Sequence, residues 1–228
     1  MATADEMKTR NIEVMGPELG KQYSELWQRV VKIHIYWCEY VEMFGTNPKR
    51  VAVMNQAAPA FFRMLQDELC DSTLMHLARL TDKSEMRGRK NLTIQNLPGL
   101  IDREVTRIKV DKLVKEVLEK TEFCRQRRHL KLAHDDLATA LKEKKARPLA
   151  KATTAHVDEA LQAIARTMHV IHSDYLHADM QFEPLGPRST GAIGLLYVLR
   201  DGIKQREGRR KRIMDGKPTE DDFKPDEL

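Results

Sequence analysis

The amino-acid sequence predicts an all-α protein, an elongated antiparallel helical bundle that is expected to dimerise. Apolar residues recur three and four positions apart over several long stretches, which is the pattern of amphipathic helices. No stretch alternates apolar and polar residues between hairpin turns, so no β-sheet is expected. The helices that the pattern predicts are longer than a compact globule of 228 residues requires. This length favours an elongated bundle and a dimer.

The N-terminal half of the chain is expected to hold two long helices and a loop. The first helix covers residues 17–44 and ends at Gly45. The second covers residues 48–82, and Pro59 either kinks it or divides it, because proline lacks the N–H group that an inner helical turn needs. Residues 83–90 are polar and charged, which predicts a loop.

The middle of the chain is expected to return toward a basic segment through one more helix. A short helical turn is predicted over residues 92–101. The next helix starts with Asp102 as its N-cap and runs toward Arg128. Residues 142–151 contain Pro148 and are interpreted as a linker.

Two further helices are expected in the C-terminal part. Thr153 or Thr154 can cap the first, whose apolar stripe continues to Phe182. The second covers residues 190–214 and is apolar early and basic late. The acidic end, residues 219–228, is expected to be disordered.

This pattern predicts one helical domain with two extensions. Residues 1–15 form an N-terminal extension, residues 16–200 the bundle, and residues 201–228 a basic helix end with an acidic tail. The formal net charge of +5 is compatible with a polyanionic partner, and equally with an ordinary mildly basic protein.

Cysteine usage and hydropathy predict a soluble, cytoplasmic protein that does not enter a membrane. The three cysteines are far apart and lie within apolar helical patterns, which argues against disulfides and zinc; they are Cys38, Cys70 and Cys124. No apolar run approaches the roughly 20 residues that a membrane span needs. No cofactor is expected.

The segment from Arg127 to Asp136 carries the strongest chemical signal. It sets arginine, two histidines, His129 and His134, and two aspartates within ten residues of a helical chain. Arginine can hold a phosphate bidentately, histidine can move a proton near neutral pH, and aspartate can orient either group. This is the set of groups that metal-free cleavage of a phosphodiester requires.

An arginine followed several residues later by a histidine is a weak pattern by itself. The pairs Arg29 to His34 and Arg166 to His172 also satisfy it, and both are interpreted as structural because helical periodicity explains their surroundings. In an uninterrupted helix, the six steps from Arg128 to His134 turn the two side chains roughly 120° apart. Either the helix is broken there, or two copies of the chain share the site.

The residues Arg128-His129-Leu130-Lys131-Leu132-Ala133-His134-Asp135 resemble the Arg-polar-x-x-x-Ala-His-x signature of HEPN domains, and the abortive-infection, AbiU-like branch fits best. The resemblance covers roughly residues 15–200. It includes the flanking segments 60–63, 77–82 and 91–94, which occur in the order typical of that branch. The signature departs from the family at His129, where asparagine or aspartate is commoner.

The resemblance implies a helical bundle that dimerises, so that two signature segments face each other across a cleft and act as a metal-independent endoribonuclease. In this interpretation His134 moves protons, Arg128 clamps the phosphate and His129 is a second polar contact. Asp135 or Asp136 orients histidine or arginine, with Arg127 in support. The alternative is that Arg128, His129 and Asp135 hold dimer helices together by ion pairs.

Two further groups of residues have a functional and a structural interpretation. The histidines and carboxylate of one helix, His169, His172, Asp174 and His177, can be a metal site, but a solvated helix face explains them better and no metal is expected. Basic side chains can contact RNA phosphates or form a solvated helix end; they are Lys131, Lys204, Arg206, Arg209 and Arg210.

Two functions therefore remain open. The first is an endoribonuclease that serves as toxin or effector in prokaryotic defence or a toxin-antitoxin system, with RNA as substrate and an antitoxin protein as a possible partner. The second is a non-catalytic dimeric helical module that binds RNA or a protein partner.

Overall fold

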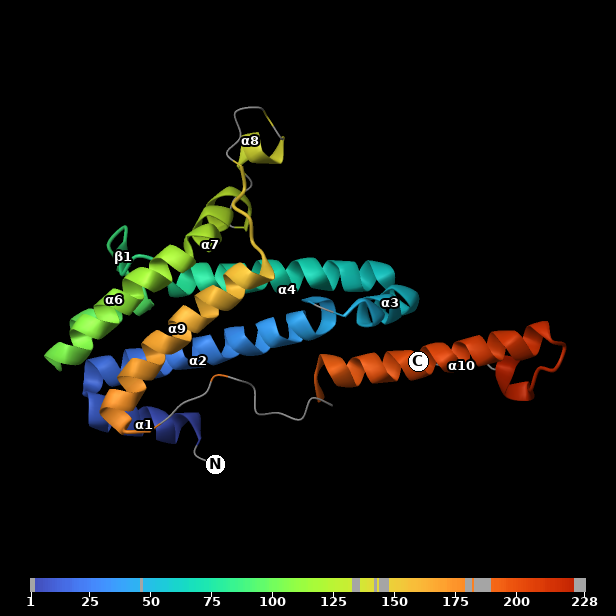
Figure 1. Ribbon diagram of the computed structural model, residues 1–228, viewed down its shortest axis with the longest axis horizontal. Helices are drawn as coiled ribbons and strands as arrows, with labels where there is room; N and C mark the ends of the chain where they lie inside the picture. The colour runs from blue at the N-terminus through green and yellow to red at the C-terminus, as the bar shows by residue number, and fades with distance from the viewer. Residues whose placement is uncertain are drawn as a thin grey trace. The chain divides into compact units, whose positions relative to one another are not determined.

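The computed structural model describes residues 3–45, 47–132, 136–141, 143, 148–178, 182 and 190–223, and its secondary structure is almost entirely helical (Figure 1). The all-α prediction is confirmed. Among these residues the only strands are β1 (Glu85–Met86) and β2 (Arg89–Lys90), which pair antiparallel. Both turn residues, Arg87 (φ 52°) and Gly88 (φ 71°), have positive φ, as a tight hairpin turn requires. The sequence analysis missed this hairpin because its strands are too short to show alternation.

The chain divides into two compact units, each built from two separate stretches. The first unit comprises Met1–Cys38 and Glu68–Pro184, and the second comprises Glu39–Asp67 and Leu185–Leu228. The division into an extension, a bundle over residues 16–200 and a tail stays a prediction.

Long helices build the first unit: α1 (Ala4–Met15), α2 (Pro17–Tyr40, up to Cys38), the later part of α4 (Pro59–Leu80), α6 (Glu104–Lys120) and α9 (Thr154–Leu176). Helices α6 and α9 lie side by side (Figure 1). Lys120 bonds Glu159 near one end of this pair and Thr106 bonds Asp174 near the other, so the two helices are antiparallel.

The apolar stripes predicted for α2 and α9 form the centre of this core. Leu26, Ile164 and Met168 are completely buried. The Tyr23 hydroxyl donates to the Met168 carbonyl, whereas Trp37 Nε1 donates to the Asp158 carboxylate at 2.6 Å. These contacts run in opposite directions along the two helices, so α2 and α9 are antiparallel as well.

Helix α1 crosses α2 at Gly20, where the two backbones touch. A Cβ atom on Gly20 would lie 2.5 Å from the Asn11 carbonyl oxygen and 2.6 Å from the Ile12 Cα atom. Both contacts are with backbone and cannot be relieved by a rotamer change. The residue before this helix, Thr3, forms a capping box with Glu6, which fixes the start of α1.

Replacing Gly20 by alanine is therefore expected to lower the free energy of unfolding by about 2 kcal/mol, the cost of overpacking a close contact. Urea unfolding followed by tryptophan fluorescence measures this, because both tryptophans, Trp27 and Trp37, lie in the first unit. Gly99→Ala is the matched control, since a Cβ atom there meets nothing within 4 Å. Equal stabilities of the two variants would contradict the close approach.

Several predicted helix boundaries hold, and others are wrong. Pro59 divides the second helix, which forms α3 (Pro48–Ala57) and α4. The turn over residues 92–101 forms as a 3₁₀ helix, η2 (Ile94–Asn96), followed by α5 (Leu97–Leu100). Asp102 does not cap α6, because its carboxylate instead accepts a hydrogen bond from the Tyr175 hydroxyl.

The helix predicted to reach Phe182 is shorter than expected. Thr153 caps α9 by accepting from the His156 N–H group, but the helix ends at Leu176, because His177 takes the left-handed conformation (φ 51°, ψ 33°). Phe182 still packs on this unit, with its ring 4.5 Å from that of Trp27. Half of the predicted linker, residues 142–151, lies outside the described residues.

The second unit has its own apolar core, formed by α3, α10 (Ala192–Met214) and the π-helical turn η1 (Val41–Gly45). Met43, Met54 and Leu196 are buried in it. The Glu39 carboxylate accepts from the Ala192 N–H group at 2.5 Å and so caps α10. A Cβ atom on Gly191 would lie 2.3 Å from that carboxylate, so a larger residue there would make the Glu39 side chain move away from its capping position.

The acidic tail is partly ordered, which corrects the expectation of disorder for its first residues. Glu220–Phe223 form a 3₁₀ turn, η5, in which buried Asp222 binds the Arg212 guanidinium at 2.5 and 3.0 Å. This guanidinium holds the pKa of Asp222 well below its usual range. Residues 224–228 lie outside the described residues.

No helix within the described part of the chain combines the length and the apolar character that crossing a bilayer requires.

Candidate functional site

The regular α-helical geometry of the chain is interrupted twice near the signature, at Thr121 and at Arg128. Helix α6 ends at Lys120, and the hydroxyl of its C-cap residue, Thr121, donates to the Val117 carbonyl at 2.7 Å. A short helix, α7 (Glu122–Arg127), follows and passes into a π-helical stretch, η3 (Arg128–Leu132). The α-helix is therefore not continuous through the signature, and Arg128 stands at the junction. π-helical turns are rare and often occur at functional sites.

Arg128 is held by an ion pair with Asp82, just beyond the end of α4. Nη1 of Arg128 lies 2.5 Å from both carboxylate oxygens of Asp82. The two side chains are only 14% and 18% exposed, so the pair is largely shielded from water. Shielding makes the pair costly to break, because either partner alone would be a nearly buried charge.

A second arginine, Arg125, braces the same turn. Its Nη1 donates to the Thr81 hydroxyl at 3.1 Å and to the Thr121 hydroxyl at 2.8 Å, and its Nη2 binds Glu122 at 2.6 Å. Sequence reasoning missed Arg125 and gave Asp82 no role. The signal was present in the segment 77–82, which belongs to the family resemblance and ends in this threonine and aspartate.

Arg127, predicted as a supporting residue, binds the segment that leads into α9. Its Nη1 donates to the Ala150 carbonyl at 2.9 Å. Its Nε is buried without a hydrogen-bond partner among the described residues. Within that part of the chain no carboxylate pairs with it, so its charge adds to the positive character of the signature.

The two other polar side chains described in the signature lie at the surface. His129 is exposed. Lys131 is half exposed and lies 3.1 Å from the Asp71 carboxylate of α4, in a pair accessible to solvent. Such a pair contributes little to stability and leaves Lys131 available to exchange its partner for a phosphate.

Asp136 has a local structural task. Its carboxylate accepts from the Thr139 N–H group at 2.9 Å and from the Thr139 hydroxyl at 2.8 Å, which caps the short helix α8 (Leu137–Ala140). Ala133, His134 and Asp135 lie outside the described residues. The predicted proton-transfer group and its neighbouring carboxylate are therefore not placed relative to Arg128.

Three of the four residues in the two other arginine-to-histidine pairs are engaged elsewhere, in agreement with their structural interpretation. Arg166 pairs with Glu116 on α6. His172 is buried and lies 3.2 Å from the Tyr23 hydroxyl. His34 stacks on Phe182 with ring centroids 5.4 Å apart, and burial lowers its pKa to about 4.

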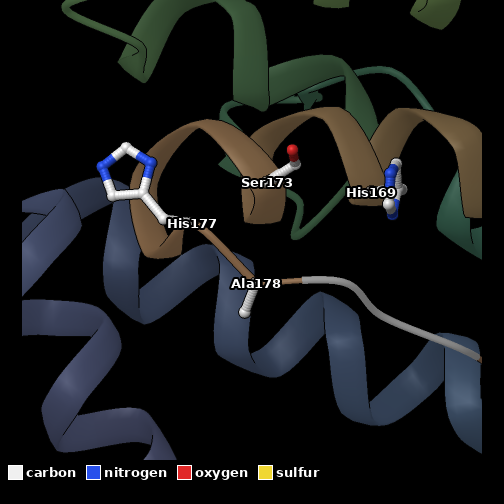
Figure 2. A pocket seen from close by; sticks show the side chains of 4 residues that line it. All are labelled: His169, Ser173, His177 and Ala178. Atoms are coloured by element: carbon white, nitrogen blue, oxygen red, sulfur yellow. The ribbon is translucent and has the colours of Figure 1, made fainter.

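His169 of α9 and His177, the residue that follows this helix, line a shallow pocket but do not converge. Figure 2 shows His169 and His177 at opposite ends of the pocket, with Ser173 between them. Asp174 is directed to α6 instead, where it binds Arg103 at 3.2 Å and accepts from Thr106. Among the described residues no cluster of histidine, cysteine and carboxylate side chains could hold a metal ion.

Burial also determines the reactivity of Cys124, the cysteine nearest to the signature along the chain. Cys124 lies on α7 with no exposed surface, and burial raises its pKa to about 12. A thiol with this pKa stays protonated at neutral pH and does not act as a nucleophile.

The basic residues of α10 belong to the second unit and differ in how they are engaged. Arg206 donates to the Gln56 carbonyl at 2.9 Å. Lys204 and Arg210 are exposed, whereas Arg209 is partly buried. Helix α10 therefore presents cationic side chains at the surface in addition to those that bind within the second unit.

A comparison with family models matches residues 16–193 to the HEPN family AbiU2. The match spans most of the chain and includes α2, Asp82 and the whole signature. No curated protein and no solved structure matches the chain. The chain therefore belongs to the AbiU2 family of HEPN proteins, a family of the abortive-infection type.

Proposed function

We propose that this protein is a metal-independent endoribonuclease of HEPN type that acts as a toxin or effector in prokaryotic defence or in a toxin-antitoxin system. It works in the cytoplasm as a homodimer whose two signature segments share one cleft, and an antitoxin protein restrains it. The observation that carries the proposal is the nearly buried Arg128 guanidinium, fixed by Asp82 at the start of the π-helical signature stretch of an AbiU2 family member.

The reaction uses the RNA 2′-hydroxyl as nucleophile. Attack on the adjacent phosphorus forms a 2′,3′-cyclic phosphate and releases the 5′-oxygen of the next nucleotide. His134 removes the hydroxyl proton and returns a proton to the departing oxygen, while Arg128 stabilises the charge on the phosphorane. His129 adds a polar contact, and Asp135 or Asp136 orients the imidazole or an arginine.

Basic side chains other than the phosphate-binding arginine serve as secondary RNA contacts in this proposal. Lys131, together with Lys204, Arg206, Arg209 and Arg210 of α10, would bind RNA phosphates without reading sequence, because cations at a phosphate backbone add affinity and salt dependence but no base recognition.

Incubating the purified protein with RNA in EDTA tests the activity. We expect endonucleolytic cleavage that persists in the chelator, and products that carry 2′,3′-cyclic phosphate ends. End-group analysis before and after treatment with a cyclic-phosphate-opening phosphatase identifies these ends. Cleavage that stops in EDTA, or products with 3′-hydroxyl ends, would contradict the metal-free mechanism.

One observation favours the second candidate function, a non-catalytic dimeric module that binds RNA or a protein. Arg128 already has a carboxylate partner within its own chain, as a purely structural arginine would. The same assay separates the two functions, since the module binds RNA without cutting it.

A further inference from the structure

The position of Asp82 is fixed by its backbone as well as by its side chain. The Thr93 hydroxyl donates to the Asp82 carbonyl at 2.7 Å and to the Leu80 carbonyl at 3.0 Å. The Gln95 side-chain amide donates to the carbonyls of Asp82 at 2.8 Å and Thr81 at 3.0 Å. Hydrogen bonds from one short segment thus hold the turn after α4, and Arg125 braces it from the other side.

Asp82 uses only one nitrogen of the Arg128 guanidinium. Both carboxylate oxygens bind Nη1, and among the described residues nothing accepts from Nε or Nη2. A guanidinium carries five N–H groups in a rigid plane, and its Nε–Nη2 edge matches two phosphate oxygens. The pairing therefore ties the guanidinium at Nη1 and leaves its Nε–Nη2 edge without a partner among the described residues.

We propose that Asp82 is the positioning residue of the phosphate site: it holds Arg128 by Nη1 so that the Nε–Nη2 edge binds the scissile phosphate. This inference rests on the proposed function and assigns a task to a residue outside the signature. Asp82 itself does not touch RNA.

This role and a simple charge effect predict different results for Asp82→Asn. Removing a negative charge beside a phosphate site strengthens RNA binding through electrostatics alone. Releasing Arg128 from Asp82 instead lowers the rate of the chemical step, because a small misplacement of a catalytic group costs about 100-fold. We therefore expect kcat to fall about 100-fold with KM unchanged or lower.

Two further variants make the test specific. Asp82→Glu keeps the charge on a longer side chain and is expected to recover part of the lost kcat. Asp71→Asn is the matched control, because it removes another ion pair between α4 and η3, the one with Lys131. Asp71 is 33% exposed, so this pair is accessible to solvent. Its loss is expected to leave kcat within about twofold of the unchanged protein. Melting curves of all variants establish that they are folded.

The experiment measures RNA cleavage kinetics and, in parallel, binding of a non-cleavable 2′-O-methyl RNA by the unchanged protein, by Asp82→Asn, by Arg128→Ala and by the double variant. A kcat of Asp82→Asn within threefold of the unchanged protein, or an equal loss of kcat in Asp71→Asn, overturns the positioning role.

The binding measurement tests the positioning role separately from catalysis. If the unchanged protein binds RNA without cutting it, the proposed function fails, but the positioning role stands when Asp82→Asn alters binding only while Arg128 is present. In that case, additive effects of the two substitutions on RNA binding overturn it. No RNA binding at all overturns it as well.

Discussion

Replacing His134 by alanine is expected to lower the rate of RNA cleavage about 1000-fold without unfolding the protein. Among the side chains of the signature, only an imidazole can both accept and donate a proton near neutral pH, and the loss of positioned proton transfer costs between about 100-fold and 10,000-fold. The measurement is the single-turnover rate on a labelled RNA in EDTA.

His156→Ala is the control for the His134 variant. His156 is exposed on α9 in the same unit and lies outside the signature, so its loss is expected to leave the cleavage rate unchanged. If His134→Ala cleaves as fast as the control, His134 has no catalytic role and the proton-transfer mechanism is wrong.

Acidification is expected to destabilise the first unit through His34. The ring is partly buried against Phe182, its Nε2 has no hydrogen-bond partner among the described residues, and burial lowers its pKa from 6.5 to about 4. Between pH 6.5 and pH 4 the unfolded chain therefore binds a proton that the folded chain does not, so stability falls as the pH falls through this window. The pKa shift corresponds to a contribution of about 3 kcal/mol to the free energy of unfolding. This contribution is present above pH 7 and lost near pH 4.

Comparison with His34→Met isolates this contribution, because methionine fills a similar volume and does not titrate. Urea unfolding followed by tryptophan fluorescence reports the relevant packing, since Trp27 contacts Phe182. We expect the stability of the methionine variant relative to the unchanged protein to rise by about 3 kcal/mol from pH 7 to pH 4. A difference that does not vary with pH would mean that His34 titrates alike in both states.

The helices could be predicted because apolar residues spaced three and four apart lie on one face, and are buried together, only when the segment is an α-helix. Leu26 and Ile164 lie on stripes visible in the sequence, and both are buried at the centre of the first unit. Helix ends were less predictable, because they depend on tertiary contacts. The tyrosine that binds Asp102 and removes it from capping lies 73 residues further along the chain.

The candidate site was predictable in its residue types but not in its partners. The signature predicts Arg128 as a site residue, and the family match covers this position without assigning it a role. The carboxylate that holds it comes from Asp82, 46 residues earlier, and nothing in local spacing joins the two. The π-helical turn at Arg128 was equally hidden, because the sequence between Arg127 and Leu132 is compatible with a regular helix.

In the function proposed above, two copies of the chain must join to form one RNA-cleaving site. The most direct test measures the specific activity on RNA in EDTA over a dilution series that crosses the monomer-dimer equilibrium, with sedimentation under the same conditions. We expect the specific activity to follow the dimer fraction and to vanish as the monomer dominates. Undiminished specific activity in a purely monomeric sample, or a dimer that cleaves no RNA, would contradict the account.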